Sequence, residues 1–240
     1  MLKPINLSVF RFKKFDVKQA NNPLKVGTDA MLLGAFIDAT DKKLGLDLGT
    51  GTGVLSLMVA QKNTEIQIDA IEINSLASDE CSFNFEQSIW SNRLNCCEGN
   101  YLNLDFQKRY ELIFSNPPYH LESIIGEDLD YNRAKHSDRN ELSELFRLVN
   151  RILSDDGDFW LILPFQLQTY IQKIASENQL YCKQLIQIHA KENKPNSRTI
   201  FQFQKKESNL SVSDFYIRNA DNSYTEAYIQ LTKAFHFVEL

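Results

Sequence analysis

The sequence has little that would support a metal site, a disulfide framework or a membrane span. Its 240 residues include four cysteines (Cys81, Cys96, Cys97 and Cys182), which form no Cys-x-x-Cys pair and have no histidines nearby at metal-ligand spacing. The N-terminal segment lacks the apolar core of a secretory signal, and the longest apolar run, around residues 30–37, is too short to cross a bilayer. We therefore expect a cytoplasmic protein with reduced thiols and no bound metal.

Proline is also scarce, and positive charge is confined to parts of the chain. Six prolines, 43% hydrophobic and 24% charged residues are typical of an ordinary globular protein. The formal net charge of −5 argues mildly against a nucleic acid partner. However, residues 1–25 carry six basic residues against one acid, and residues 183–206 carry the same. Such segregation suits a surface that faces RNA, although solvated basic surfaces are also common.

The order of predicted elements indicates one α/β domain. Short β-rich runs alternate with stretches of helical periodicity from about residue 44 onward. The predicted strands are 44–48, 66–73, 93–98, 110–115, 157–164, 183–190 and 199–206, and the predicted helices are 53–63, 75–88, 141–153 and 165–178. The last two strands have no helix between them and should form an antiparallel hairpin. This pattern predicts a doubly wound, seven-stranded, mostly parallel sheet that ends in that hairpin.

The first 40 residues precede this alternation and form a separate N-terminal arm in our interpretation, with residues 41–240 as the main domain. In the arm, Phe10 and Phe12, then Phe15 and Val17, keep a period of two with basic residues between them. An amphipathic strand packed on the domain edge would have this pattern. Aromatic and basic residues interleaved in this way also suit stacking on unpaired bases.

A glycine-rich loop follows the first predicted strand. Asp47 ends the strand, and Gly49, Gly51 and Gly53 lead into a helix, where the backbone must turn sharply and approach a ligand closely. A nicotinamide fingerprint needs its third glycine where Val54 stands, so that interpretation is weakened. An acid before Gly-x-Gly-x-Gly instead suits an adenosine ligand that carries an amino acid, and we expect S-adenosylmethionine.

Two further residues extend the predicted cofactor site. Glu72 closes the second strand about 20 residues beyond the loop, where an acidic side chain can accept hydrogen bonds from both ribose hydroxyls. Asn100 follows the third strand, where an acid commonly holds the adenine amino group; an asparagine can still accept through its carbonyl oxygen.

The stretch IFSNPPYH places a stiff loop at the end of the fourth predicted strand. Pro117 and Pro118 fix the backbone and stop the sheet ladder. An adenine exocyclic amine is a poor nucleophile because its lone pair is delocalised into the ring. The side-chain oxygen of Asn116 and the carbonyl of Pro117 can accept both of its hydrogens, while Tyr119 offers a face for stacking. The same geometry would serve the carboxamide nitrogen of a glutamine.

Five segments in this order and spacing resemble the bacterial tRNA1(Val) (adenine(37)-N6)-methyltransferase family, a branch of the class I methyltransferases. They are FRFKKFDV, KVGTDAMLLGAF, DLGTGTG, IEIN and NPPY, and the closing YTEAYIQLTKAFH resembles that family's C-terminal helix. The resemblance spans nearly the whole chain. It implies S-adenosylmethionine as methyl donor, tRNA as substrate and a monomeric enzyme.

The resemblance also implies roles for individual residues. Gly27, Thr28 and Asp29 would lie beside the methionine end of the cofactor, while Asn116, Pro117 and Tyr119 would hold the adenine. Basic residues expected to contact RNA are Arg11, Lys13, Lys14, Arg133 and Arg198. Arg133 belongs to residues 121–140, expected to be a long polar loop whose mixed charges fit either a lid that closes over RNA or a plain solvated loop. Two departures from the family pattern are His120, where an aromatic residue is expected, and Asn100, where an acid is expected.

Two other functions fit part of the pattern. A protein glutamine methyltransferase of the release-factor type also uses Asn-Pro-Pro-Tyr, but resembles a longer architecture with a helical domain ahead of the glycine loop; here only 46 residues precede Asp47. A non-catalytic RNA-binding module could keep the fold. It would have no need for both Glu72 and the loop at Asn116, since neither is required for folding alone.

Overall fold

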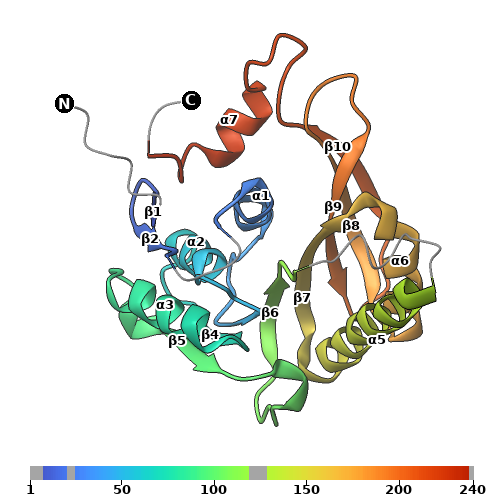
Figure 1. The fold of residues 1–240 in the computed structure, drawn as a ribbon, viewed down its shortest axis with the longest axis horizontal. Coiled ribbons are helices and arrows are strands. Elements are labelled where there is room, and N and C mark those ends of the chain that lie inside the picture. The colour runs from blue at the N-terminus through green and yellow to red at the C-terminus, as the bar shows by residue number, and fades with distance from the viewer. Residues whose placement is uncertain (1–7, 21–24, 119–128, 238–240) are drawn as a thin grey trace.

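The computed structural model describes residues 8–20, 25–118 and 129–237, and the side chains of residues 129–139 lie outside this description. Its strands are β1 (Val9–Arg11), β2 (Asp16–Lys18), β3 (Leu44–Leu48), β4 (Gln67–Glu72), β5 (Leu94–Glu98), β6 (Tyr110–Ser115), β7 (Leu153–Pro164), β8 (Tyr181–His189), β9 (Asn196–Gln204) and β10 (Ser211–Tyr216). Its α-helices are α1 (Thr28–Phe36), α2 (Val54–Lys62), α3 (Ser75–Glu86), α5 (Leu129–Ile152), α6 (Gln168–Glu177) and α7 (Glu226–Thr232). Figure 1 shows how they are arranged.

The main sheet has eight strands in the order β10-β8-β9-β7-β6-β3-β4-β5. The five strands from β7 to β5 are parallel, β9 runs antiparallel to both of its neighbours, and β10 is parallel to β8. The predicted α/β class, with a mostly parallel sheet and a closing antiparallel hairpin, is confirmed. The added strand β10 was not anticipated, because residues 211–216 carry too little alternation to mark a strand at the sheet edge.

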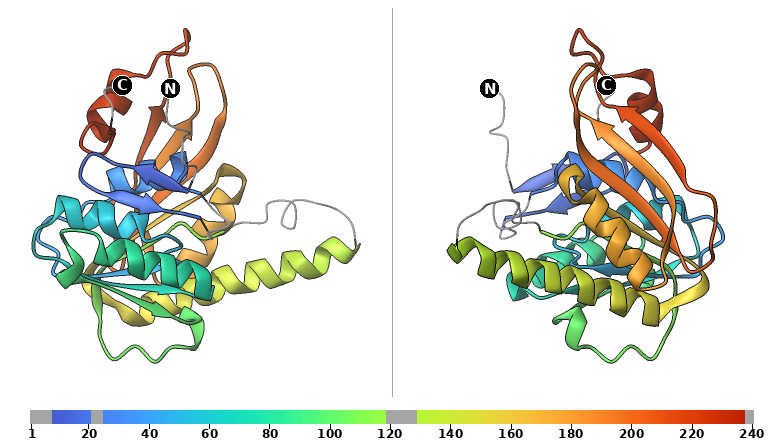
Figure 2. Two further views of the ribbon diagram at one scale, coloured as in Figure 1. Left: turned by 60° about the vertical axis from the view of Figure 1, so that its left-hand side comes forward. Right: turned by 90° about the vertical axis from the view of Figure 1, so that its right-hand side faces the viewer.

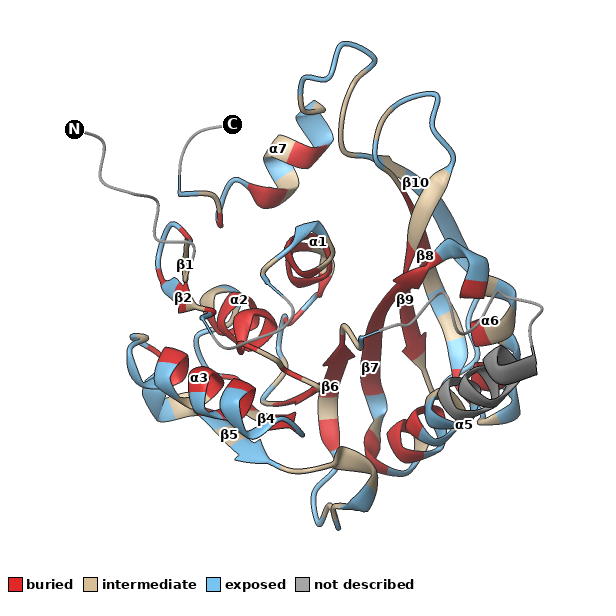
Figure 3. Cartoon of the chain, in the orientation of Figure 1, coloured by how far each residue is buried: buried red, intermediate tan, exposed pale blue. Residues whose placement is uncertain are grey.

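Helices cover both faces of this sheet, and each face has its own hydrophobic core. Helices α1, α2 and α3 bury their apolar residues on one face, and α5 and α6 bury theirs on the other. Strand β7 serves both cores, since Trp160 and Ile162 face the first core while Phe159 and Leu161 face the second. Figure 3 shows these buried residues along the central strands and on the inner sides of the helices.

The N-terminal arm forms a short antiparallel hairpin, β1 and β2, against the first core. Phe12 and Phe15 are buried and stack with ring centroids 4.4 Å apart, and Phe15 meets Trp90 edge to face at 5.6 Å. The C-terminal segment after α7 closes over the hairpin, because the amide of Lys13 donates to the carbonyl of Phe235. Figure 2 shows the hairpin above helix α3, which β2 contacts. The structure thus favours edge packing for these two rings, which are not exposed for base stacking.

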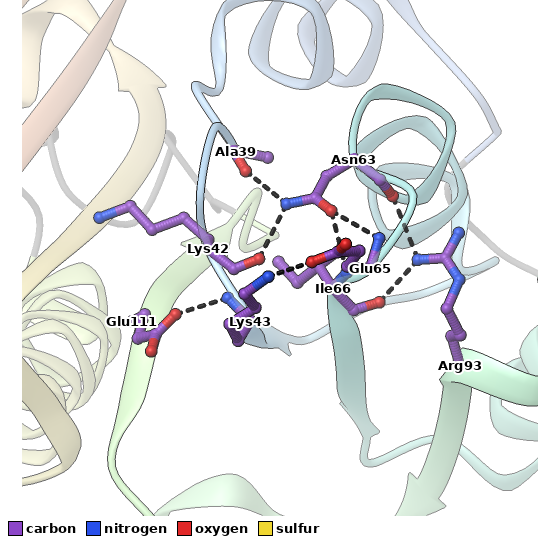
Figure 4. Close-up of polar contacts among 8 residues, drawn as sticks. All are labelled: Ala39, Lys42, Lys43, Asn63, Glu65, Ile66, Arg93 and Glu111. Carbon is purple, nitrogen blue, oxygen red and sulfur yellow. Dashed lines mark hydrogen bonds and ion pairs between the residues drawn. The ribbon is translucent and has the colours of Figure 1, made fainter.

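The amino-terminal end of the sheet is held by side chains bonded to backbone groups (Figure 4). The amide of Asn63 donates to the carbonyls of Ala39 and Lys42, and its oxygen accepts from the amide of Ile66. Arg93 donates to the carbonyls of Asn63 and Ile66. These bonds fix the starts of β3 and β4, so this end of the sheet is built for stability.

The expected polar loop at residues 121–140 is corrected in part. Helix α5 begins at Leu129, twelve residues earlier than the predicted start near Glu141. The stretch from 129 to 140 has neither glycine nor proline, and a helix that is already packed at 142–152 extends at low cost because its nucleus exists. Residues 121–128 lie outside the described residues. In the part of the chain that the structure describes, no helix combines the length and apolar character that a membrane crossing needs.

Candidate active site

A cavity of about 390 Å³ opens at the carboxyl ends of β3, β4 and β6. The chain leaves β3 toward β4 on one side and returns to it through β6 on the other, so strand order reverses here. Open α/β sheets bind ligands in the crevice at such a point. The cavity is within the size range of small-molecule sites. Of the residues predicted from sequence, its lining includes Gly49, Gly51, Glu72, Asn100, Asn116 and Pro117.

The glycine loop needs left-handed backbone at three positions. The φ angles of Gly49, Gly51 and Gly53 are +70°, +58° and +81°, values that side chains with a Cβ rarely adopt. The amides of Gly49 and Thr50 both donate to the carbonyl of Ile71, at 2.9 and 3.0 Å, and so tie the loop to β4. The loop therefore lies across the ends of two neighbouring strands.

Gly49 and Gly53 meet different surroundings. A Cβ built on Gly49 would have nothing within 4 Å, whereas one on Gly53 would lie 2.5 Å from the ring of Phe85 and 2.9 Å from the sulfur of Cys81. Gly49 lines the cavity and Gly53 does not. Gly53 instead allows the loop to pack closely on α3.

Asp47 lies behind the loop, fully buried, and is not part of the cavity lining. Its Oδ2 accepts hydrogen bonds from the hydroxyls of Thr50 at 2.6 Å and Ser56 at 2.7 Å. Burial raises the pKa of this carboxyl to about 6, against the lowering effect of the two hydroxyls. Its Oδ1 has no hydrogen-bond partner among the described residues. An unpaired carboxylate oxygen this close to the loop fits a cationic ligand nearby.

Glu72 bridges the glycine loop and the start of α3. Its Oε2 accepts from the amide of Gly51 at 2.8 Å, and its Oε1 accepts from the amide of Asn74 at 2.9 Å. A carboxylate has about four lone-pair sites, so these two bonds leave acceptor capacity toward the cavity that Glu72 lines. The side chain can therefore hold the loop and still accept from a diol.

Asn100 and Tyr101 form the wall beyond β5. The Oδ1 of Asn100 accepts from the amide of Leu102 at 2.9 Å and caps the short helical turn Tyr101–Asn103. Burial raises the pKa of the Tyr101 hydroxyl, and the charges of Glu141 and Glu72 add to the rise. Glu141, on α5, lines the same cavity. Acidic groups therefore surround this end of the site.

Lys25 and Val26, which precede α1, and Ala30 in the first turn of α1 form the opposite wall. Gly27, Thr28 and Asp29, predicted from the resemblance to lie by the cofactor, belong to the same turn but are not among the lining residues. Asp29 accepts from the Nε of Arg198 at 2.8 Å. This ion pair joins α1 to β9, across 169 positions of the chain.

The loop after β6 completes the site. Asn116, Pro117 and Pro118 line the cavity together with Gly49 and Gly51. Tyr119, predicted to stack on the base, and His120 lie outside the described residues.

The predicted RNA contacts are spread over several elements. Arg11, Lys13 and Lys14 are exposed on the hairpin, where Arg11 lies over the ring of Phe237 at 5.9 Å. Arg198 is engaged by Asp29. Arg133 is on α5, and its side chain lies outside the described residues.

Sequence reasoning missed several lining residues. Thr50 and Thr52 stand between the glycines and Ile73 follows Glu72, so their positions within the motifs were a usable signal. Lys25 opens the segment KVGTDAMLLGAF, which was a further signal. Glu141 had none, because only the packing of α5 brings it to the cavity.

Comparison with known proteins adds independent information. The family model described as methyltransferase small domain matches residues 20–183. A tRNA1(Val) (adenine(37)-N6)-methyltransferase of Actinobacillus pleuropneumoniae serotype 5b (strain L20) is 35% identical over 228 residues, which cover 95% of this chain and 96% of that protein. One of the same name from Flavobacteriaceae bacterium (strain 3519-10) is 36% identical over 234 residues, covering 96% and 99%.

Solved structures share the fold. A predicted O-methyltransferase from Agrobacterium tumefaciens superposes with a TM-score of 0.69 at 16% identity, covering 86% of this chain and 96% of that one. A putative RNA methyltransferase from Pyrococcus horikoshii gives a TM-score of 0.52 at 19% identity, covering 74% and 82%. At these identities the likeness concerns the fold alone.

Proposed function

The chain belongs to the tRNA1(Val) (adenine(37)-N6)-methyltransferase family, and from this we propose that it methylates the exocyclic N6 of adenine 37 in a valine tRNA. The methyl donor is S-adenosylmethionine, as in methyltransferases of this family. One observation carries the proposal from the structural side: Asn116 and Pro117 line the same cavity as Gly49, Gly51 and Glu72. The site proposed for the methyl donor and the site proposed for the methyl-accepting amine therefore share one cavity.

The residues present fit this cofactor. When bound, S-adenosylmethionine supplies an electrophilic methyl group on a positively charged sulfur. We assign Gly49 and Gly51 to close backbone approach and Glu72 to the ribose hydroxyls, since Glu72 lines the cavity with acceptor capacity to spare. The orphaned Oδ1 of buried Asp47 adds negative charge behind the loop, which favours a cationic ligand.

Further cofactor assignments rest on proximity to the cavity. Gly53 supports the loop from behind, and Asn100 faces the adenine end with Glu141 nearby. Gly27, Thr28 and Asp29 are assigned to the methionine end, because the residues on either side of them line the cavity.

Asn116 and Pro117 act on the nitrogen that accepts the methyl group. The Asn116 side-chain oxygen and the Pro117 carbonyl accept the two amine hydrogens, which localises the lone pair on nitrogen and aims it into the cavity. The two prolines keep both oxygens in place. As the nitrogen bonds to the methyl carbon, the bond from that carbon to the positively charged sulfur would break and leave a neutral thioether. One amine proton would then pass to solvent, so the step needs no charged base and no metal.

The base must leave any helical stack to reach this pocket. An unpaired nucleotide in a loop costs less to extrude than one in a duplex, and the anticodon loop provides such a nucleotide. Tyr119 is assigned to stack on the base. A tRNA substrate supports a cytoplasmic location.

The surrounding RNA is assigned to basic residues outside the cavity. Arg11, Lys13 and Lys14 on the hairpin, Arg133 on α5 and Arg198 on β9 would contact phosphates. In this proposal residues 1–40 serve as an arm that flanks the cofactor, residues 41–240 form the catalytic domain, and the enzyme works as a monomer.

The test is methyl transfer from labelled S-adenosylmethionine to total tRNA that lacks the modification, followed by digestion to nucleosides. We expect N6-methyladenosine in a valine tRNA. Label on a glutamine of a release factor, or no label in any substrate, would reject the proposal in favour of a protein methyltransferase or a binding module.

Asn116→Ala tests the assigned role. We expect the transfer rate to fall by about 100-fold or more, because one of two acceptors for the amine is lost, while cofactor affinity stays near that of the wild type. Asn178→Ala, at the end of α6, is the matched control and should retain full activity. A parallel loss of rate and cofactor affinity in Asn116→Ala would contradict the role.

A further inference from the structure

The last residue of β6 makes a buried hydrogen bond between the two halves of the site. The hydroxyl of Ser115 donates to the carbonyl of Leu48 at 2.6 Å, and both residues are almost fully buried. Leu48 is the residue before Gly49, and Ser115 is the residue before Asn116. The bond therefore joins the start of the glycine loop to the start of the Asn-Pro-Pro loop.

This bond continues the contact between β3 and β6 where their backbone pairing stops. The paired residues of the two strands run from Gly45 and Leu112 to Asp47 and Phe114. Beyond this point Leu48 pairs with β4 and Ser115 pairs with β7, so each strand is held by its other neighbour. The Ser115 hydroxyl adds a side-chain bond between the two strand ends at this point.

A displacement of Ser115 also displaces Asn116, its neighbour in the chain. One peptide link separates them, and the following Pro117 and Pro118 have fixed φ angles, so few soft dihedrals remain to absorb a shift. On the other side, the amides of Gly49 and Thr50 are fixed to the carbonyl of Ile71. A change in the spacing of the strand ends would therefore move the Asn116 oxygen relative to the glycine loop.

We propose that Ser115 is a positioning residue, which sets the distance between the loop that holds the methyl donor and the loop that holds the accepting amine. This inference rests on the proposed function. Transfer between two bound groups is sensitive to their separation, and a misplacement of about 1 Å can cost roughly 100-fold in rate. A short hydroxyl-to-carbonyl bond in a buried setting resists such movement.

The experiment compares Ser115→Ala and Ser115→Cys with the wild type in single-turnover methyl transfer to unmodified tRNA, at saturating cofactor and tRNA. Ser115→Ala removes the donor, and Ser115→Cys replaces it with a slightly larger and weaker donor. Cofactor affinity and the free energy of unfolding are measured for each variant. Thr232→Val is the control, since the buried Thr232 hydroxyl also donates to a carbonyl, that of Tyr228, at 2.7 Å within α7.

We expect the rate of Ser115→Ala to fall about 10- to 100-fold with cofactor affinity within about twofold of the wild type. Ser115→Cys should show a loss in the same direction, and Thr232→Val should lose stability without losing rate. An unchanged rate in both Ser115 variants, or a rate that falls only in step with cofactor affinity or stability, would overturn the inference. A wild-type protein that methylates no tRNA would instead reject the proposed function.

Discussion

At the scale of single residues, the three glycines of one motif have different physical roles. All three adopt positive φ, yet a Cβ on Gly49 would enter open space and a Cβ on Gly53 would collide with Phe85 and Cys81. Gly49 lies on the cavity wall, so its lack of a side chain leaves room for a ligand. Gly53 lets the loop and α3 pack closely, so its role is in the stability of the fold and not in contact with a ligand.

This difference predicts that alanine at Gly49 mainly weakens cofactor binding, whereas alanine at Gly53 mainly lowers stability. Gly49→Ala should lower the free energy of unfolding by only about 1–2 kcal/mol, the cost of the left-handed backbone, while weakening cofactor binding. Gly53→Ala carries the same backbone cost and overpacks the core as well, so its loss should be larger by about 1–3 kcal/mol. Urea denaturation and cofactor titration of both variants provide the measurement. Equal losses of stability would show that the collision at Gly53 is relieved at no cost.

At the scale of elements, one buried side chain links the N-terminal hairpin to the glycine loop. The amide group of Asn84, on α3, donates to the carbonyls of Lys18 and Thr52 at 2.9 and 2.8 Å, and its oxygen accepts from the amide of Lys18 at 2.8 Å. Lys18 belongs to β2 and Thr52 to the glycine loop. The basic hairpin is thereby fixed relative to the cofactor site.

Asn84→Ala should release β2. Because three backbone groups lose their partner, one buried and two part-buried, we expect a loss of about 2–4 kcal/mol in the free energy of unfolding. Faster hydrogen exchange at the Lys18 amide should accompany this loss. Asn95→Ala serves as control, because Asn95 is exposed and its side-chain amide makes two long contacts, to Asp69 at 3.3 Å and to the sulfur of Cys97 at 3.5 Å. Wild-type protection of the Lys18 amide in Asn84→Ala would show that the hairpin is held by its aromatic packing alone.

At the scale of the whole molecule, the two ends of the central sheet have different roles. The carboxyl ends of β3, β4 and β6 carry the cavity, and the amino-terminal end carries the network around Asn63. The chain has a net charge of −5, yet its first 25 residues hold six basic residues and one acid. An acidic protein can therefore present a positive arm to RNA.

Replacing Lys13 and Lys14 with alanine should test this arm. If each lysine neutralises one phosphate, tRNA affinity should fall and the slope of log affinity against log salt should become shallower by about 1–2. Cofactor affinity should stay unchanged. Lys43→Ala with Lys108→Ala is the control, because these exposed lysines precede β3 and β6 at the other end of the sheet. An equal change in slope in both double variants would assign the effect to net charge and not to the arm.

Much of the architecture was accessible from sequence because its causes are local. The apolar run within residues 157–164 and the helical spacing within 53–63 depend on neighbours a few positions apart, and they predicted a strand and a helix that the structure contains. The confirmed fold class follows from the order of such elements, since short connections and right-handed crossovers leave few topologies. Residues 129–140 are the exception. Their many charged residues led to the prediction of a loop, although the stretch contains no glycine or proline and is helical in the structure.

The sequence by itself determined the motifs, their order and the family, because a glycine loop or an Asn-Pro-Pro turn is encoded in adjacent residues. Only the tertiary structure decided which of those residues reach the cavity. It placed Asp47 behind the loop and brought Glu141 of α5 to the wall. It also paired Asp29 with Arg198 and joined Ser115 to Leu48 across two strands. These contacts depend on how distant segments pack, and the free energy of that packing belongs to the folded chain as a whole and is not encoded in any single segment.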